Sequence, residues 1–300
     1  MRFGITALLF SETFDEGDLP LLERCREFGF DVVEICPVEP DRFPAQRVRQ
    51  LADELDMSVN INFALPEEAN TISPDAEVRR RGVELLKKIT DLCAEAGAEI
   101  YCGANYCAWR YFTGRRRTDD EWKWAVECYR QAAEYAQDNS DLVLAVEALN
   151  RFESFFLNTA ADTLRFVEDV EMPNVKVHLD TFHMIGEEDD MSAAIRSCGD
   201  RLGYFHACGS QRGIPGRDMV PWRETLTALR DSGYQDCITI ESFNSRQKFA
   251  PLVAIWRDLA DSPEQLATEG LAYLQSVYRD VYAPGTRERE NRLATPEEEP

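Results

Sequence analysis

The chain has little histidine, little lysine and no long apolar run. It contains three histidines and five lysines in 300 residues. No apolar run approaches the roughly 20 residues that a membrane-spanning helix needs, so we expect no membrane partner. The opening residues, MRFGITALLF, hold one basic residue and no small-residue cleavage site, which is typical of a first strand rather than a signal peptide. We therefore expect a cytoplasmic protein.

Basic residues are also scarce relative to acidic ones. The chain has 55 aspartates and glutamates against 33 lysines and arginines, which gives a net charge of −22. Because such a surface repels phosphate backbones at long range, we expect no nucleic-acid partner. The nine cysteines include no CxxC pair, and several lie within or beside apolar segments. We interpret them as reduced core residues of a reducing compartment rather than as zinc ligands.

Strand-like and helix-like patterns alternate along the whole chain. The predicted strands cover residues 2–9, 32–36, 58–65, 99–103, 142–149, 175–181, 202–208 and 237–243. The predicted helices cover residues 19–28, 44–55, 74–96, 119–137, 159–169, 191–198 and 222–231, and helical stretches follow from about residue 250 to 282. Eight strand–helix units in this length predict an α/β fold, a single-domain (β/α)₈ TIM barrel over residues 1–282. Residues 283–300 are charged and nearly free of large apolar side chains, which predicts a disordered tail.

Four of the predicted strands each carry, near their carboxyl end, a residue that can bind a hard metal ion. In chain order these residues are Glu147, Asp180, His206 and Glu241. Each lies on the strand face opposite the bulkiest aliphatic side chains, so we expect it to point into the barrel. Taken singly, such an acid is more often a cap or a solvated residue, and a lone histidine is more often a core residue. Four at equivalent positions favour one common centre at the carboxyl end of the barrel.

Three carboxylates and one imidazole form a donor set that consists mostly of oxygen. Such a set suits a hard or borderline divalent ion, Mn²⁺, Mg²⁺ or Co²⁺, better than a thiolate-loving one. Crowding three acids without a cation would raise their pKa values by mutual repulsion, and a divalent ion removes that repulsion. The residues therefore predict a metal-dependent enzyme site.

One long stretch resembles a known enzyme family. The segment VEALNRFESFFLNTAADTLRFVEDVEMPNVKVHLDTFHM, followed by FHACGSQRGIPG, VPW and IESF, closely resembles the ketose 3-epimerases. These are the D-tagatose 3-epimerases and D-psicose (allulose) 3-epimerases among the xylose-isomerase-like barrels. The resemblance is dense over residues 143–243 and looser, but collinear, before them. It implies an isomerase that inverts C3 of a free ketose of the D-tagatose, D-psicose, D-fructose or L-ribulose type, with Mn²⁺ as the expected ion. It also implies a homodimer or homotetramer.

The resemblance assigns roles to individual residues. The positions that match the family's metal ligands are Glu147, Asp180, His206 and Glu241. Two of these, Glu147 and Glu241, also match its acid/base glutamates. The positions that match contacts to the O1–O3 end of the sugar are Glu153, His183 and Arg212. Trp109, in GANYCAW, resembles the family's aromatic residue beside the substrate.

These roles agree with the chemistry of epimerisation. Inverting C3 requires removal of a proton from one face and its return to the other, so two acid/base groups must flank one carbon. Glu147 and Glu241 would do this through a cis-enediolate, whose negative charge the metal stabilises as a Lewis acid. His183 or Arg212 would donate hydrogen bonds to the same charge.

Two segments depart from the family pattern. The residues after His206 read ACGSQRG, where many members carry a Glu-Asn pair before Arg-Gly, so Gly209 and Ser210 alter the loop. The first strand ends in ALLF, without the Trp or Tyr that is often present. Both concern recognition of C4–C6 rather than the metal centre. We interpret His178, one layer below Asp180, as a buried residue that is either structural or in contact with the metal ligands, and Arg217 as a solvated loop residue.

Other functions stay open at this point. An aldose–ketose isomerase of the hydroxypyruvate or xylose type, or a sugar-phosphate epimerase, could use the same ligands. A DNA-binding relative of the apurinic-site endonucleases would need a multi-zinc cluster with many histidines. Three histidines and a net charge of −22 argue against that relative. A non-catalytic sugar-binding barrel fits least, because both glutamates and the whole ligand set are present.

Overall fold

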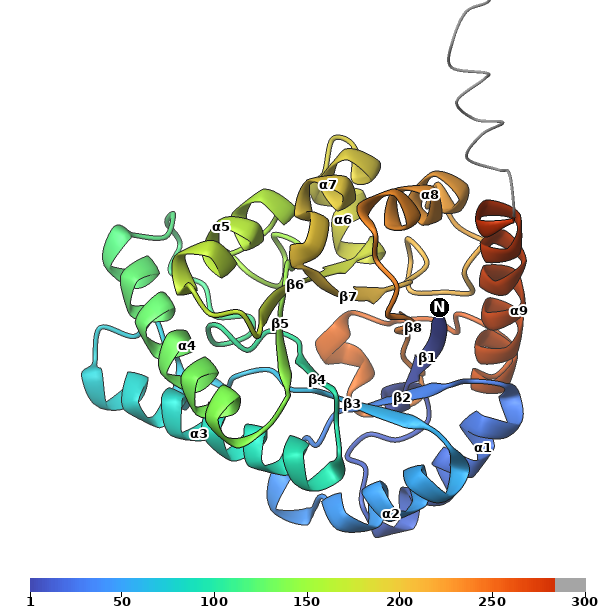
Figure 1. The fold of residues 1–300 in the computed structure, drawn as a ribbon, viewed down its shortest axis with the longest axis horizontal. Helices are drawn as coiled ribbons and strands as arrows, with labels where there is room; N and C mark the ends of the chain where they lie inside the picture. The colour runs from blue at the N-terminus through green and yellow to red at the C-terminus, as the bar shows by residue number, and fades with distance from the viewer. Residues whose placement is uncertain (284–300) are drawn as a thin grey trace, which may run out of the picture.

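The computed structural model describes residues 1–283, which form a closed barrel of eight parallel strands surrounded by helices (Figure 1). The strands are β1 (Arg2–Thr6), β2 (Val32–Ile35), β3 (Ser58–Asn62), β4 (Ile100–Cys102), β5 (Val143–Glu147), β6 (Val175–Asp180), β7 (Leu202–His206) and β8 (Cys237–Ile240). Each strand pairs with the next along the chain, and β8 pairs with β1. This confirms the predicted (β/α)₈ TIM barrel. The tail predicted for residues 283–300 lies, from residue 284 onward, outside the described residues.

Helices follow the strands and cover the outside of the barrel. They are α1 (Pro20–Phe28), α2 (Ala45–Leu55), α3 (Ala76–Ala96), α4 (Asp119–Asn139), α5 (Ala160–Val170), α6 (Thr181–Glu187), α7 (Met191–Cys198), α8 (Trp222–Ser232) and α9 (Pro263–Tyr282). The last of them, red in Figure 1, packs beside α8 and completes the ring. Helical stretches lie between about residues 250 and 282, as the sequence predicts. A short 3₁₀ helix, η6 (Ala250–Val253), and an irregular segment precede α9 there.

Capping side chains mark the starts of the two longest helices, α3 and α4. At α4, Thr118 and Glu121 form a reciprocal capping box, which confirms the start that the sequence predicts. The predicted start of α3 at Ser73 and Pro74 is two residues too early. The carboxylate of Asp75 accepts the backbone N–H of Glu77 at 2.8 Å and fixes the helix start there.

Several strands end earlier than their apolar sequence predicts. After β1, residues Ala7–Leu9 form a 3₁₀ helix, η1, and β8 stops at Ile240. The apolar residues beyond these ends, such as Leu8 and Phe243, pack in a small cluster over the barrel instead of continuing the ladder. As a result Glu241 lies just past its strand, in the loop that borders the barrel mouth.

The buried apolar residues form two layers, as the strand phase predicts. Between strands and helices lie the bulky aliphatic and aromatic residues, including Val146, Leu179 and Phe205. Inside the barrel lies a smaller cluster of mostly smaller side chains, including Ala145 and Cys237. Each large apolar side chain that is fully buried contributes about 1.5–3 kcal/mol to folding, so the outer layer fixes which strand face points inward.

The cysteines behave as the sequence predicts. All nine are unpaired, and eight of them are buried. Within residues 1–283, no helix is long and apolar enough to cross a membrane.

Candidate active site

A cavity of about 470 Å³ opens at the carboxyl ends of the strands. Loop residues that follow β2, β3 and β4, such as Val38, Phe63 and Ala104, form part of its wall. Six of the predicted site residues also line it: Trp109, Glu147, Glu153, His183, Arg212 and Glu241. The two others, Asp180 and His206, are completely buried. The structure thus brings all the predicted site residues to one end of the barrel.

One nitrogen of His206 lies close to the carboxylates of the three other predicted ligands. Nδ1 of His206 lies 3.6 Å from Oδ2 of Asp180, 3.7 Å from Oε1 of Glu241 and 3.9 Å from Oε1 of Glu147. Atoms that each lie about 2.1 Å from one ion are roughly 3–4 Å apart, so these separations match the first coordination sphere of one cation.

The strand register places these side chains. Asp180 and His206 are direct partners across β6 and β7, and His206 is the partner of Thr239, two residues before Glu241. Asp180 is also the N-cap of α6, where its Oδ1 accepts the backbone N–H of Phe182 at 2.6 Å. This bond holds the carboxylate so that its second oxygen faces the centre.

Three of the converging atoms lack a hydrogen-bond partner within the described residues. These buried atoms are Oε1 of Glu147, Oδ2 of Asp180 and Nδ1 of His206. Buried polar atoms in proteins nearly always have a partner. A divalent cation would satisfy all three atoms together, and the oxygen-rich set suits a hard ion. The residues therefore fit a divalent metal.

The two glutamates of the centre have raised pKa values. Burial raises the pKa of Glu147 well above its ordinary value, and the nearby charge of Glu241 adds to this. Burial also raises the pKa of Glu241, but the guanidinium of Arg212, which contacts its Oε2, opposes the shift. A divalent cation at the centre would lower both pKa values.

Arg212 reaches the centre from the loop after β7. Its guanidinium stacks on the ring of Phe182 at 4.0 Å, and the side chain is almost fully buried. The loop is tight: a Cβ at Gly209 would lie 2.7 Å from the backbone oxygen of Gly213, so only glycine fits there. The departure from the family pattern at Gly209 therefore belongs to a turn that still delivers Arg212 to the cavity.

Glu153 and Trp109 form a hydrogen-bonded pair on the cavity wall. Nε1 of Trp109 donates to Oε2 of Glu153 at 3.1 Å, and Oε1 of Glu153 lies 3.6 Å from Nη2 of Arg212. Burial acts to raise the pKa of Glu153, but the charges of Arg212 and His183 and the hydrogen bonds from Trp109 and Asn150 together outweigh it, so this pKa is lowered. The carboxylate of Glu153 is therefore an ionised hydrogen-bond acceptor, and Trp109 and Arg212 fix its orientation from two sides.

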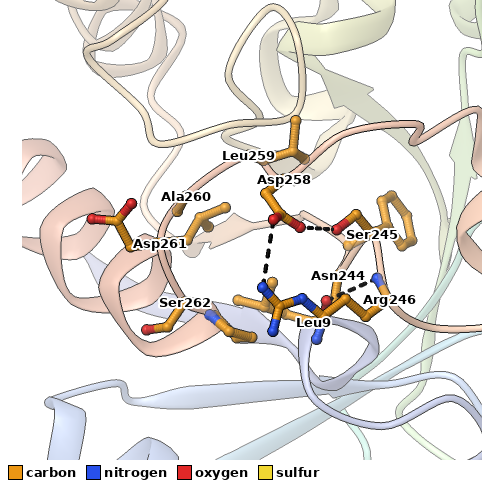
Figure 2. Close-up of a pocket in the computed structure, with 12 residues that line it drawn as sticks. Leu9, Asn244, Ser245, Arg246, Asp258, Leu259, Ala260, Asp261 and Ser262 are labelled. Atoms are coloured by element: carbon orange, nitrogen blue, oxygen red, sulfur yellow. Dashed lines mark hydrogen bonds and ion pairs between the residues drawn. The ribbon is translucent and has the colours of Figure 1, made fainter.

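The connection between β8 and α9 folds back over the cavity. Phe249 and Val253 line it, and Phe249 stacks on Trp109 with ring planes 14° apart. Figure 2 shows how the connection is fastened: Asp258 accepts a hydrogen bond from Ser245 and pairs with Arg246 at 3.5 Å. These residues line a second, smaller cavity of about 100 Å³. The hydrogen bond and the ion pair hold the two ends of the segment together and so fix the part of the cavity wall that contains Phe249.

Comparison with known proteins identifies the family. The model of the family described as Xylose isomerase-like TIM barrel matches residues 22–277. An L-ribulose 3-epimerase of Methylomonas sp. is 31% identical over 93% of this chain and 98% of its own length. A D-psicose 3-epimerase of Agrobacterium fabrum is 32% identical over 87% of this chain and 91% of its own length. The chain belongs to the ketose 3-epimerases of this barrel family.

A solved structure agrees with this assignment. The D-allulose 3-epimerase of Methylomonas sp., in complex with D-allulose, matches this ketose 3-epimerase chain with a TM-score of 0.87. The two are 29% identical, and the match covers 93% of this chain and 97% of the other. The family resemblance inferred from the motifs is confirmed.

Two residues of this family member were not predicted to belong to the site. Glu34, on the inward face of β2, places Oε2 2.7 Å from Nε2 of His206. The backbone N–H of Asn150 donates to Nδ1 of His183 at 3.0 Å. A charged residue between Val33 and Ile35 in a buried strand was the available signal for Glu34. The sequence held no such signal for Asn150 beyond its position in the LNRFE motif.

His178 and Arg217, to which the sequence assigns no catalytic or metal-binding role, lie as expected. His178 is completely buried, and its ring packs edge-on against that of His206 with centroids 4.2 Å apart. Arg217 is exposed and pairs with Glu269 at 2.5 Å on the surface. These positions agree with a structural role for His178 and a solvated one for Arg217.

Proposed function

We propose that this protein is a divalent-metal-dependent ketose 3-epimerase, an isomerase that inverts C3 of a free ketose. One observation carries the proposal. Glu147 and Glu241, on either side of β6 and β7, border the same cavity and lie within 3.9 Å and 3.7 Å of Nδ1 of His206. The relatives named L-ribulose 3-epimerase and D-psicose 3-epimerase support the same activity.

In this proposal the two glutamates move the proton. One carboxylate takes the proton from C3 on one face of the sugar, and the other, in its protonated form, returns a proton to the opposite face. Both carboxyl groups border the cavity, which supports this exchange of roles because each can reach a bound sugar. Reaction in the reverse direction exchanges their parts.

Other side chains would hold the oxygens of the reacting end. Nε2 of His183 lies 3.3 Å from Nη2 of Arg212, and both atoms face the cavity as donors. Two donors this close call for a shared acceptor, such as a sugar oxygen that gains negative charge during the reaction. Glu147, Asp180, His206 and Glu241 would hold a divalent ion, which supplies Lewis-acid stabilisation of that charge.

The cavity favours an unphosphorylated substrate. The cations that line it are Lys88 and Arg212. Lys88 pairs with Asp41 at 2.5 Å, and Arg212 contacts Glu241. Both are therefore engaged, whereas a phosphate dianion would need cations of its own. This supports a free ketose of the D-tagatose, D-psicose, D-fructose or L-ribulose type.

Three further properties belong to the proposal. Mn²⁺ is the proposed ion, supported by a set of three carboxylates and one imidazole. A homodimer or homotetramer is supported by large apolar side chains that stay exposed after β5, β7 and β8, namely Phe152, Met219 and Trp256. A cytoplasmic location is supported by nine unpaired cysteines.

The deciding experiment is a sugar panel in D₂O with Mn²⁺ present. D-fructose, D-psicose, D-tagatose, L-ribulose and D-xylulose are each incubated with the protein and followed by NMR. We expect deuterium at C3 together with the C3 epimer. Exchange at C1 or C2 with an aldose product would instead identify an aldose–ketose isomerase. No exchange in any sugar, in a sample with bound Mn²⁺, would contradict both activities.

A further inference from the structure

A buried carboxylate lies behind the predicted metal centre, on the side away from the cavity. Glu34 projects inward from β2 and is completely buried. Its Oε2 lies 2.7 Å from Nε2 of His206, the ring nitrogen that does not face the centre. A carboxylate accepts hydrogen bonds, so Nε2 carries the proton in this contact.

Neighbouring strands hold Glu34 in this position. Nδ2 of Asn62, on β3, donates to Oε1 at 3.2 Å, and Sγ of Cys102, on β4, donates to Oε2 at 3.3 Å. The carboxylate thus has partners from three other strands, counting His206 on β7. Its orientation is set by the barrel itself and not by a loop.

We infer that Glu34 is the positioning residue of the metal centre: it holds His206 with Nε2 protonated, so that the lone pair of Nδ1 points at Glu147, Asp180 and Glu241. A metal-binding histidine needs its ligating nitrogen free of a proton, and the hydrogen bond at the other nitrogen decides this. The distances of 3.6–3.9 Å from Nδ1 to the three carboxylates depend on this ring orientation. The inference rests on the proposed metal-dependent function.

Glu34 also adds charge. It is a fourth carboxylate near the centre, but the imidazole of His206 separates it from the ion position. It therefore increases attraction for a cation without taking a coordination position. Orientation and charge can be separated by substitution. Glu34→Gln keeps an oxygen that accepts from Nε2 and removes the charge, whereas Glu34→Leu removes both.

The test is Mn²⁺ affinity, measured by calorimetry on metal-free wild type, E34Q and E34L. Loss of such a partner typically weakens metal binding about 10- to 100-fold, so we expect E34L in that range and E34Q between it and wild type. E121Q is the matched control. Glu121 is also a buried acid, but it pairs with Arg115 at the start of α4, so its variant should bind Mn²⁺ like wild type.

The melting temperature of each metal-free variant separates positioning from folding. A folded E34L that binds Mn²⁺ within about twofold of wild type would overturn the inference, as would an equal loss in E121Q. If E34L does not fold, E34Q decides by ¹⁵N NMR of the Mg²⁺-loaded protein, where three histidines give few signals. We expect the Nε2-bound proton of His206 to shift in E34Q, and an unchanged signal with unchanged affinity would overturn the inference. A wild type that binds no Mn²⁺ would instead contradict the proposed function.

Discussion

The backbone N–H of Asn150 donates a hydrogen bond to Nδ1 of His183 across 3.0 Å. A backbone amide can only donate, so Nδ1 accepts, and the proton of the neutral imidazole resides on Nε2. Nε2 lines the cavity side of the ring, 3.8 Å from Oε1 of Glu147. Nε2 of His183 is therefore a hydrogen-bond donor, as the proposed contact with a sugar oxygen requires.

The tautomer of His183 predicts an order among its variants. In His183→Gln the amide nitrogen can occupy the place of Nε2 and still donate, whereas in His183→Asn the side chain reaches only the place of Nδ1. We expect H183N to lower kcat by about 100- to 1,000-fold, the usual effect of losing one donor to a developing charge, and H183Q to lose less. Initial rates of epimerisation with saturating Mn²⁺ measure this. Equal losses in both variants would contradict a donor role for Nε2.

The two-glutamate scheme predicts that neither acid is dispensable. Glu147→Gln and Glu241→Gln keep an oxygen for a metal but remove the acid/base function, so each should lower turnover by at least about 100-fold. Because each residue serves one face of the sugar, a single variant can still exchange the C3 proton of one epimer with D₂O. NMR of separate incubations with each epimer detects this.

A matched control for this pair lies on the same cavity. Glu68 also lines this cavity, but it is exposed, whereas Glu147 and Glu241 are buried. E68Q should epimerise at a near-normal rate. Near-normal turnover in E147Q or E241Q would remove that residue from the scheme.

Metal removal should abolish activity and lower stability. Without a cation, burial raises the pKa of Glu147, and the nearby charges of Glu241 and Asp180 add to the shift. EDTA treatment followed by dialysis should stop epimerisation, and Mn²⁺ or Co²⁺ should restore it. Binding to the folded state alone adds about 2.7 kcal/mol at a metal concentration 100 times Kd, so the melting temperature should rise with Mn²⁺. Full activity in a sample verified to be metal-free would contradict the metal's role.

The barrel and its central residues could be predicted because both follow from the two-residue alternation of side chains along a strand. Alternation along each strand separates bulky outward residues such as Val146 and Leu179 from inward ones such as Glu147 and Asp180. That pattern depends only on which face the helices cover. The pattern does not depend on the loops, so the four ligands could be predicted without any knowledge of the distances between them.

What was missed depends on contacts between distant segments. Glu34 and His206 are far apart in the chain, and only the closed barrel brings their side chains together. The helix α6 starts directly at Asp180, whose carboxylate serves as its cap and also faces the centre, and a seven-residue helix is too short for a clear period. The segment that contains Phe249 has no hydrophobic periodicity, because hydrogen bonds such as that from Ser245 to Asp258 set its position.

The buried imidazole of His183 predicts how stability depends on pH. Burial lowers the pKa of His183 to about 4, and the charge of Arg212 acts in the same direction, although Asp180 and Glu153 oppose it. An unfolded chain protonates this histidine near its ordinary value of 6.5, so between about pH 6.5 and 4 the unfolded state binds the proton and the folded state does not. The stabilising contribution is therefore complete above pH 6.5 and is lost as the pH falls, by at most about 1.4 kcal/mol per pH unit.

Urea unfolding of the metal-free protein at several pH values measures this dependence. His183→Gln removes the titrating group, so its free energy of unfolding should fall less between pH 6.5 and 4 than that of wild type. Other groups that titrate in this range are common to both proteins and cancel in the difference. Parallel curves for wild type and H183Q would mean that His183 titrates alike in the folded and unfolded chain, and would contradict its burial as a neutral donor.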